Sequence, residues 1–536
     1  MSRCAGVGVG IGIGASASVV GNAIGAVASA SAAATSAKPE SQVVLHFCTR
    51  HSVTHSAAAM GRLADMLALL RGCAVNPETQ KRHPIDLQRA RELGRAVIVS
   101  TEQEHAFSKF FSSLQENRRR PLSVIAIGGS VVAGTGCTQR TTERVLDGPT
   151  CSFAMRFAQW LNCTSRASNL TSIAAINRGR GGITTASALP LLPVVVRAID
   201  DRDDLGPVAD LLLIDFSAND ASFGLYQNGS KGLYREDANV TNSLVAGATE
   251  IMLRFLLTEH PHLPILLIES NCKDTPTRRS HKHVAAHYQV PFVSYGDQFP
   301  DEHCFVGEWS HRKTHPDYKE HQSIADYLSA WWTGFGSRWP ATRPTRDRLP
   351  HRGGVANLPP PLTRDAARAP FTDAVCRKSV SRYDARDWYR SGAAIADRGG
   401  VRVQNWTLEA DRPNKPGWIT YGPSGATIDF DLSFGASPRL IMLFEEGYEG
   451  WGDANLFLGS PSASRRAARS FPLRGMRADN ERVTQARLLN LDVGMDTEGG
   501  RNDFQVAPFS RHTLHVVFEA PTPQRTKFKI QHVSTC

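Results

Sequence analysis

The feature that most constrains the fold is an alternation of short apolar runs with amphipathic stretches between residues 121 and 332. The apolar runs lie at 122–127, 173–176, 211–216, 265–269 and 292–295. Segments with helical spacing of apolar residues separate them, including 152–161 and 244–257. Strands buried on both faces have continuous apolar runs, and helices connect one parallel strand to the next. The pattern therefore predicts an α/β fold with a mostly parallel sheet.

The composition changes on both sides of this segment, and the change predicts the domain organisation. We expect a low-complexity leader at 1–40, a helical N-terminal extension at 41–120, the α/β domain at 121–336, a Pro/Arg-rich linker at 337–370 and a β domain at 371–536. Within the extension, 57–70 and 86–114 have helical spacing. A linker rich in proline and arginine is typical of a connection between domains.

The C-terminal region is predicted to be an antiparallel, sandwich-like β domain. Its apolar runs lie at 418–421, 426–434, 440–444, 514–518 and 527–533, separated by turn residues. Cys376 and Cys536 lie at its two ends, where a disulfide would join the termini of one domain. The sequence alone does not establish that pairing.

The N-terminus and the sequons favour the secretory pathway. Residues 5–34 are almost wholly Gly, Ala, Val, Ile and Ser behind the single basic Arg3, which resembles a signal peptide. A disordered leader and an uncleaved membrane anchor are the alternatives. The candidate glycosylation sites are Asn162, Asn169, Asn228, Asn239 and Asn405. Together with ten widely spaced cysteines, they favour an oxidising compartment.

The charge does not predict a nucleic-acid partner. The net charge is +10, but it is spread over 536 residues with only short clusters such as Arg118–Arg120. There is no C-x-x-C pair, and no Cys/His grouping has zinc-finger spacing. We therefore expect no metal, no cofactor, no nucleic acid and no membrane contact beyond a possible N-terminal anchor. Nothing in the sequence sets the oligomeric state.

A serine follows the first apolar run directly, in Gly128-Gly129-Ser130. A serine on a glycine-rich turn from strand to helix exposes its hydroxyl beside backbone N–H groups, as a nucleophile beside an oxyanion hole requires. A tight turn with a helix-capping serine would have the same local sequence.

Three further segments follow in order along the chain. Asn177 to Thr185 is glycine-rich and contains Gly182, Ser217-Ala218-Asn219-Asp220 ends the third apolar run, and Thr314-His315-Pro316 precedes the last helix. All lie at carboxyl ends of predicted sheet elements, where an open α/β sheet places its site.

These four blocks resemble those of the SGNH (GDSL-like) hydrolase superfamily, over residues 121–332. The family implies a flavodoxin-like α/β/α fold, with Ser130 as nucleophile and His315 as base. It also implies an oxyanion hole made of the Ser130 and Gly182 N–H groups and the Asn219 side chain. Two blocks depart from the pattern, because Gly129 replaces the common aspartate and Ser217 replaces the first glycine of G-x-N-D.

A third departure concerns the histidine block. The family has an aspartate three residues before the histidine, and Arg312 occupies that position here. Loss of the acid of a triad costs a factor of about 10⁴ in rate. Glu308, Asp301 or a backbone carbonyl are the candidates to orient the imidazole instead.

The resemblance implies an ester hydrolase of the secretory pathway that acts on an acylated small molecule or glycan, for example by removing acetyl groups. The alternatives are a catalytically weakened scaffold that binds carbohydrate through its β domain, and a polysaccharide O-acyltransferase that uses the same serine.

Other polar residues have mainly structural interpretations. We expect His281, His283 and His287 to be solvated on a surface helix. Asp215 is either near the active site or bonded to a neighbouring loop. Tyr448 and Trp451 either stack on sugars or, as we favour, pack in the domain.

Overall fold

The computed structural model describes most of the chain from Asp86 onward. The described residues are 86–116, 120–140, 145–167, 170–199, 205–226, 243–271, 275–298, 315–339, 358–368, 379–392, 399–412, 415–459, 470–476, 484–493, 504 and 506–536. All of them belong to one compact unit, Thr54–Cys536. The leader expected at 1–40 and the helix expected at 57–70 lie outside the described residues.

Five parallel strands form the central sheet, in the order β4-β1-β7-β8-β9. Their bounds are β1 Leu122–Gly128, β4 Ile173–Asn177, β7 Leu211–Asp215, β8 Ile265–Glu269 and β9 Phe292–Ser294. The first of these strands in the chain lies between the second and the third, as in flavodoxin-like folds. The predicted α/β fold with a mostly parallel sheet is confirmed, and the strand order switches direction between β1 and β7.

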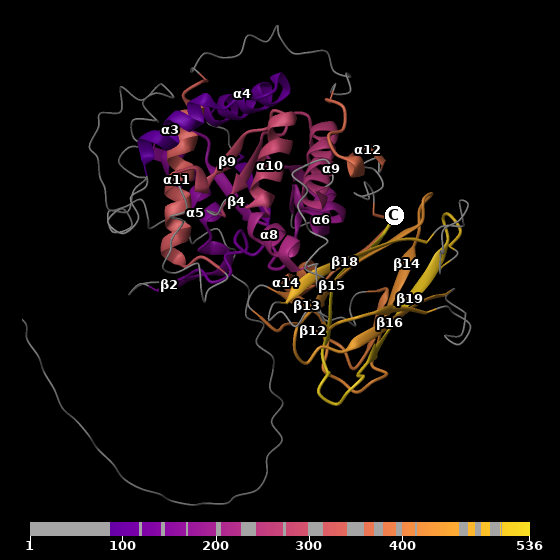
Figure 1. Cartoon of the computed structure of the whole chain (residues 1–536). Coiled ribbons are helices and arrows are strands. Elements are labelled where there is room, and N and C mark those ends of the chain that lie inside the picture. The colour runs from indigo at the N-terminus through magenta and orange to yellow at the C-terminus, as the bar shows by residue number, and fades with distance from the viewer. Residues whose placement is uncertain are drawn as a thin grey trace, which may run out of the picture. The chain divides into compact units, whose positions relative to one another are not determined.

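The sheet is buried on both faces, which is why its strands are continuous apolar runs. Successive side chains point to opposite faces, so Val124 of β1 packs in one hydrophobic cluster and Ile125 in the other. Figure 1 shows helices α5 and α11 on one side of the sheet and α9 and α10 on the other. This is the three-layer α/β/α arrangement.

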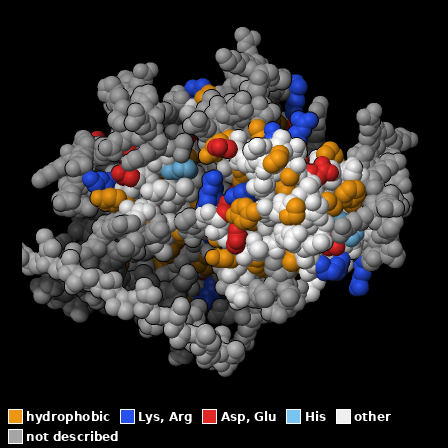
Figure 2. Space-filling model, turned by 90° about the horizontal axis from the view of Figure 1, so that it is seen from below, with side chains coloured by type: hydrophobic (Ala, Val, Ile, Leu, Met, Phe, Trp, Pro, Cys, Tyr) orange, Lys and Arg blue, Asp and Glu red, His pale blue; other side chains and the backbone are white. Residues whose placement is uncertain are grey.

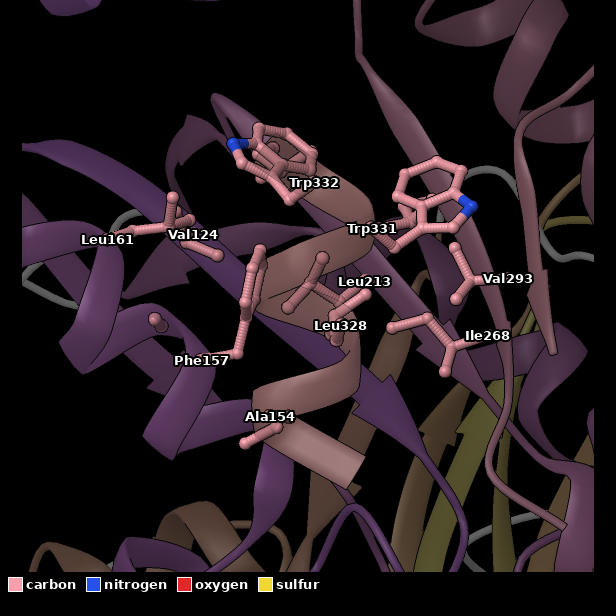
Figure 3. Close-up of a cluster of buried hydrophobic side chains, with 14 of the residues drawn as sticks. Val124, Ala154, Phe157, Leu161, Leu213, Ile268, Val293, Leu328, Trp331 and Trp332 are labelled. Carbon is pink, nitrogen blue, oxygen red and sulfur yellow. The ribbon is translucent and has the colours of Figure 1, made fainter. Parts of the chain in front are cut away.

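In the described part of the chain, six helices of eight or more residues, besides α8, Ser217–Tyr226, cover the two faces with apolar surface. They are α3 Leu87–Ala96, α4 Thr101–Gln115, α5 Phe153–Ala167, α9 Leu244–Glu259, α10 Pro276–His287 and α11 Tyr318–Gly336. Figure 3 shows Trp331 and Trp332 of α11 over the sheet, with Phe157 of α5 beside them. Phe107 of α4 belongs to the same cluster. The helices predicted at 86–114 are confirmed, and they form part of the α/β core.

The C-terminal region contains two antiparallel sheets, as predicted. One has the order β12-β13-β20-β15-β18, with β10 also paired to β20, and the other has the order β11-β14-β19-β16-β17. The first sheet comprises β10 Ser381–Asp384, β12 Thr407–Ala410, β13 Pro416–Thr420, β15 Arg439–Glu446, β18 Gln485–Asp492 and β20 Phe528–Thr535. The second comprises β11 Val401–Gln404, β14 Thr427–Ser433, β16 Asp453–Gly459, β17 Ser470–Leu473 and β19 Arg511–Glu519. Trp418, Phe430 and Phe528 are buried in their shared core.

Part of the predicted linker packs on the α/β core. Helix α12, Arg364–Arg368, follows Thr363, whose N–H and Oγ1 donate to the buried Glu250 carboxylate of α9 at 2.7 and 2.5 Å. Leu358 and Leu362 contact the hydrophobic cluster on that face. Residues 358–368 therefore complete the helical layer on the α9 side.

The charged side chains are mixed rather than separated by sign on the face that Figure 2 shows. Lys and Arg side chains lie there among Asp, Glu and apolar ones. Within the described residues, no helix has the length and apolar character needed to cross a bilayer.

A disulfide closes the loop that follows the predicted nucleophile. Cys137 and Cys151 are bonded with their Cα atoms 5.6 Å apart, and they flank the hairpin of β2, Thr138–Arg140, and β3, Val145–Asp147. Cys163 and Cys536 each take part in a disulfide bond as well. Cys376 lies outside the described residues, so the Cys376–Cys536 pairing stays a prediction.

The Cys137–Cys151 bond yields a stability prediction. Replacing both cysteines by serine should lower the free energy of unfolding by about 3 kcal/mol. The bond lowers the conformational entropy of the unfolded chain, and for a loop of this length that effect is worth about this much. Urea unfolding followed by tryptophan fluorescence measures the change. The single variant Cys137→Ser should lose the same amount, and an unchanged midpoint in the double variant would contradict the prediction.

Candidate active site

Ser130 lies just beyond the carboxyl end of β1, on a turn that only glycine can form. A Cβ atom at Gly128 would lie 2.0 Å from the Asp215 carbonyl oxygen at the end of β7. The Gly129 N–H donates to that same oxygen at 3.0 Å. The two strand ends therefore approach so closely that Gly128 cannot carry a side chain, and the turn holds Ser130 at the switch point of the sheet.

Asn219 reaches Ser130 from the neighbouring strand end. It lies in the first turn of α8, Ser217–Tyr226, directly after β7. Its Oδ1 accepts hydrogen bonds from the Ser130 N–H at 2.7 Å and from the Ser130 hydroxyl at 2.9 Å. The Ser130 N–H, expected as an oxyanion donor, is therefore bonded to Asn219. The Asn219 Nδ2 group is the amide donor that remains.

The contact with Asn219 also accounts for the glycine at position 129. A Cβ atom at Gly129 would lie 2.0 Å from Asn219 Oδ1. A side chain at this position would therefore collide with the Asn219 side chain that binds Ser130. Glycine is required here as long as Asn219 adopts this orientation.

The glycine-rich segment after β4 packs against the Ser130 turn. Asn177 holds it in place, because its Nδ2 donates to the Val132 carbonyl at 2.6 Å and its Oδ1 accepts from the Gly179 N–H at 2.8 Å. A Cβ atom at Gly179 would lie 2.5 Å from the Ala133 N atom. Gly182 has φ +83°, a conformation that favours glycine. The segment that carries Gly182 thus adjoins the one that carries Ser130.

The C-terminal region binds the same segment from the other side. Arg386 Nη1 donates to the carbonyls of Arg178 and Gly179 at 3.3 and 3.1 Å. Arg180 forms a buried ion pair of 2.7 Å with Asp384. The Ala486 N–H donates to the Gly182 carbonyl at 3.2 Å. Residues 178–182, which we name the glycine loop, are therefore fixed by both parts of the chain.

Lys415, directly before β13, brings a positive charge to the glycine loop. A Cβ atom at Gly181 would lie 2.4 Å from Lys415 Cε, 2.9 Å from Nζ and 3.5 Å from Thr135 Oγ1. The lysine stem therefore covers Gly181, close to the turn that follows Ser130. Burial lowers the pKa of Lys415.

His315 lies two residues before Asp317, which caps helix α11 in a capping box with Glu320. A Cβ atom at Gly136 would lie 3.1 Å from His315 Cβ, so the histidine packs against the loop that follows Ser130. Burial, and secondarily the charge of Lys415, lowers the pKa of His315 to about 4. The imidazole is therefore neutral at pH 7 and able to accept a proton. Arg312, Glu308 and Asp301 lie outside the described residues.

One sequence expectation is wrong in an informative way. His281 is 2% exposed, and both of its ring nitrogens contact carboxylates. Nδ1 lies 2.8 Å from Glu269 Oε2, and Nε2 lies 3.1 Å from Asp220 Oδ2. Hydrogen bonds and charge from both carboxylates outweigh burial and raise the pKa of His281 to about 10. His283, by contrast, is exposed as expected.

The Asp215 carboxylate is bonded to Ser217, two residues further along the chain at the start of α8. Its Oδ1 accepts from the N–H and the hydroxyl of Ser217 at 3.0 and 2.6 Å. Burial raises its pKa. Trp451 is 3% exposed with Lys527 over its ring, so its packing interpretation is also supported.

The sequons differ in accessibility. Asn162 is buried in α5 and its Oδ1 accepts from the Ile173 N–H at 2.9 Å, so this packing leaves no room for a glycan. Asn405 is exposed in a turn with φ +60°. Asn169, Asn228 and Asn239 lie outside the described residues. The described residues contain no group of three His, Cys, Asp or Glu side chains that could hold a metal ion.

Comparisons with known proteins find remote structural likeness only. No family model and no curated protein matches the chain. The crystal structure of a two-domain esterase (CEX) active on acetylated mannans is 14% identical, covers 83% of this chain and 98% of its own, and has a TM-score of 0.49. The same esterase co-crystallised with mannopentaose gives 14% identity, 83% and 97% coverage, and a TM-score of 0.48. CBM35 from Paenibacillus barcinonensis is 10% identical over 29% of this chain and 98% of its own, with a TM-score of 0.18. Likeness this remote transfers no activity.

The environment of His315 yields a prediction that needs no substrate. In an NMR pH titration, the His315 imidazole should titrate near pH 4. Lys415→Met should raise that pKa, because it removes a positive charge that opposes protonation. His260, whose pKa burial and Arg197 lower to about 4, is the matched control and should not change. An unchanged His315 titration in Lys415→Met would contradict the assignment of Lys415 to this site.

Proposed function

We propose that the chain is a serine ester hydrolase of the SGNH type. The observation that carries the proposal is the pair of hydrogen bonds from Ser130 to Asn219 Oδ1 across the switch point of the sheet. The glycine loop and a neutral His315 beside the same turn support the proposal, in which Ser130 is the nucleophile, Gly182 and Asn219 are the oxyanion donors and His315 is the base. No metal or cofactor takes part in the proposed reaction.

In the proposed first step, the Ser130 hydroxyl turns from Asn219 to His315. Its oxygen attacks the ester carbonyl carbon while His315 takes the hydroxyl proton, and the carbonyl electron pair moves onto oxygen. The N–H of Gly182 and the Nδ2 of Asn219 donate to this oxyanion. Removal of one such donor typically raises the barrier by about 3 kcal/mol.

The intermediate then collapses. The bond to the alcohol breaks, and the alcohol leaves with the proton from His315. Water attacks the acyl-serine in the same way, His315 again moves the proton, and the acid is released. An acyltransferase would differ only in that a sugar hydroxyl, rather than water, attacks the acyl-serine.

The electrostatics near His315 favour a slow enzyme. Burial and Lys415 both oppose the imidazolium that must form as Ser130 loses its proton. A triad has an acid to stabilise that ion, and Arg312 stands in its sequence position. The same observations favour the second candidate function, a weakened scaffold that binds carbohydrate.

Glycan deacetylation is the finer form of the proposal. Acetylated mannan is a reasonable first polymer to test, because the two-domain esterase with remote likeness is active on it.

An ester panel tests the proposed function. Wild type, Ser130→Ala and Arg312→Asp are assayed on 4-nitrophenyl acetate and on acetylated mannan, with and without an added sugar acceptor. Ser130→Ala should lose activity by a factor of at least about 10³, because its nucleophile is gone. Arg312→Asp should be faster than wild type, because an acid would stabilise the imidazolium.

Each contrary result has a distinct meaning. Turnover that survives in Ser130→Ala contradicts the serine mechanism. An inactive wild type with an active Arg312→Asp supports the binding scaffold, and acyl transfer to sugar in preference to water supports the acyltransferase.

A further inference from the structure

A buried histidine outside the four sequence blocks contacts the carboxylate that joins the two segments of the proposed oxyanion hole. His281 lies in α10, Pro276–His287, and its ring contacts Glu269 at the end of β8 and Asp220 in α8. Both carboxylates are almost fully buried, with Glu269 at 0% and Asp220 at 2% exposure. Buried carboxylates of this kind need charged or hydrogen-bonding partners, since desolvation is costly.

The protonation of His281 follows from this geometry. A neutral imidazole has one N–H and could donate to only one of the two carboxylates, leaving a lone pair against the other. The doubly protonated ring donates to both. The raised pKa of His281, about 10, agrees with this state.

Asp220 extends the connection to the other oxyanion segment. Its Oδ1 accepts from the Thr185 N–H at 2.8 Å and its Oδ2 accepts from the Thr185 hydroxyl at 2.6 Å. Thr185 begins α6, Thr185–Ala188, only three residues after Gly182. Asp220 itself follows Asn219 directly in the chain. One carboxylate thus joins the segment of Gly182 to the segment of Asn219.

We propose that His281 is a positioning residue for the oxyanion hole: it holds Asp220, and through Asp220 and Thr185 it sets the position of Gly182 relative to Asn219. This inference rests on the proposed esterase function. Without His281, Asp220 would be a buried carboxylate that lacks its charged partner, and its side chain would change position. Displacement of catalytic groups by about 1 Å costs on the order of 10² in rate.

The test separates positioning from a general loss of stability. His281→Gln keeps a donor but removes the charge, and its kcat on 4-nitrophenyl acetate should fall about tenfold to a hundredfold with KM changed less than about twofold. Thr185→Val should lower kcat in the same way, while Thr185→Ser, which keeps the hydroxyl, should retain it.

Glu250→Gln is the matched control. Glu250 is also 0% exposed, but its carboxylate accepts from Tyr288, Leu362 and Thr363, away from the oxyanion segments. The Glu250→Gln variant should have a lower melting temperature than wild type, and an unchanged kcat at a temperature where the variant is folded.

The outcomes are distinguishable. Unchanged kcat in both His281→Gln and Thr185→Val, or an equal loss in Glu250→Gln, overturns the inference while leaving the esterase proposal intact. If His281→Gln does not fold, the Thr185→Val and Thr185→Ser pair decides: equal kcat values overturn the inference. A wild type without esterase activity, or full activity in Ser130→Ala, overturns the proposed function and this inference with it.

Discussion

The close approach of β1 and β7 at their carboxyl ends is the constraint on which the site depends. Gly128 and Gly129 have no room for a Cβ atom, because the Asp215 carbonyl and the Asn219 side chain occupy that space. As a result Ser130 and Asn219, on turns after two different strands, lie within hydrogen-bond distance. The parallel sheet supplies the rigidity that keeps such a contact in register, since both strands are buried on both faces.

The glycine loop is the part of the candidate site that contacts outside the parallel sheet hold in place. On one side it continues into Thr185, which Asp220 and His281 anchor to α8 and α10. On the other side Arg386 and Ala486 of the C-terminal region bind its carbonyl groups. Backbone carbonyls held from both sides fix the direction of the intervening N–H groups. The β region is therefore a structural component of the candidate site, in addition to any binding role of its own.

How much of this could be predicted from the sequence depends on whether the signal is local. The strand at 265–269 matches β8 residue for residue, because a buried parallel strand is an uninterrupted apolar run bounded by turn residues. The signal for Gly128, Gly129 and Ser130 is equally local, because they directly follow an apolar run. The same holds for Asn219, which follows another strand. His281 could not be identified in this way. Its partners Glu269 and Asp220 are 12 and 61 residues away, and a polar residue in a helix rich in His, Lys and Arg indicates solvent exposure.

The contacts of the C-terminal region are harder still to anticipate. Arg386 and Lys415 lie more than 200 residues after the glycine loop, and no periodicity connects them to it. Two of the basic residues behind the net charge of +10 therefore have a specific place beside the loop. Arg386 donates hydrogen bonds to its carbonyls, and the Lys415 side chain lies over Gly181. The overall composition does not distinguish these two residues from the other Lys and Arg residues.

The central claim is that Ser130 is an activated nucleophile, and covalent labelling tests it most directly. A fluorophosphonate forms a phosphorus–oxygen bond with an activated serine and releases fluoride, and peptide mass spectrometry locates the adduct. The account predicts one adduct, on Ser130, that is lost in His315→Gln because the proton acceptor is gone. An unlabelled wild type, or labelling of another serine at the same rate in both proteins, would contradict it.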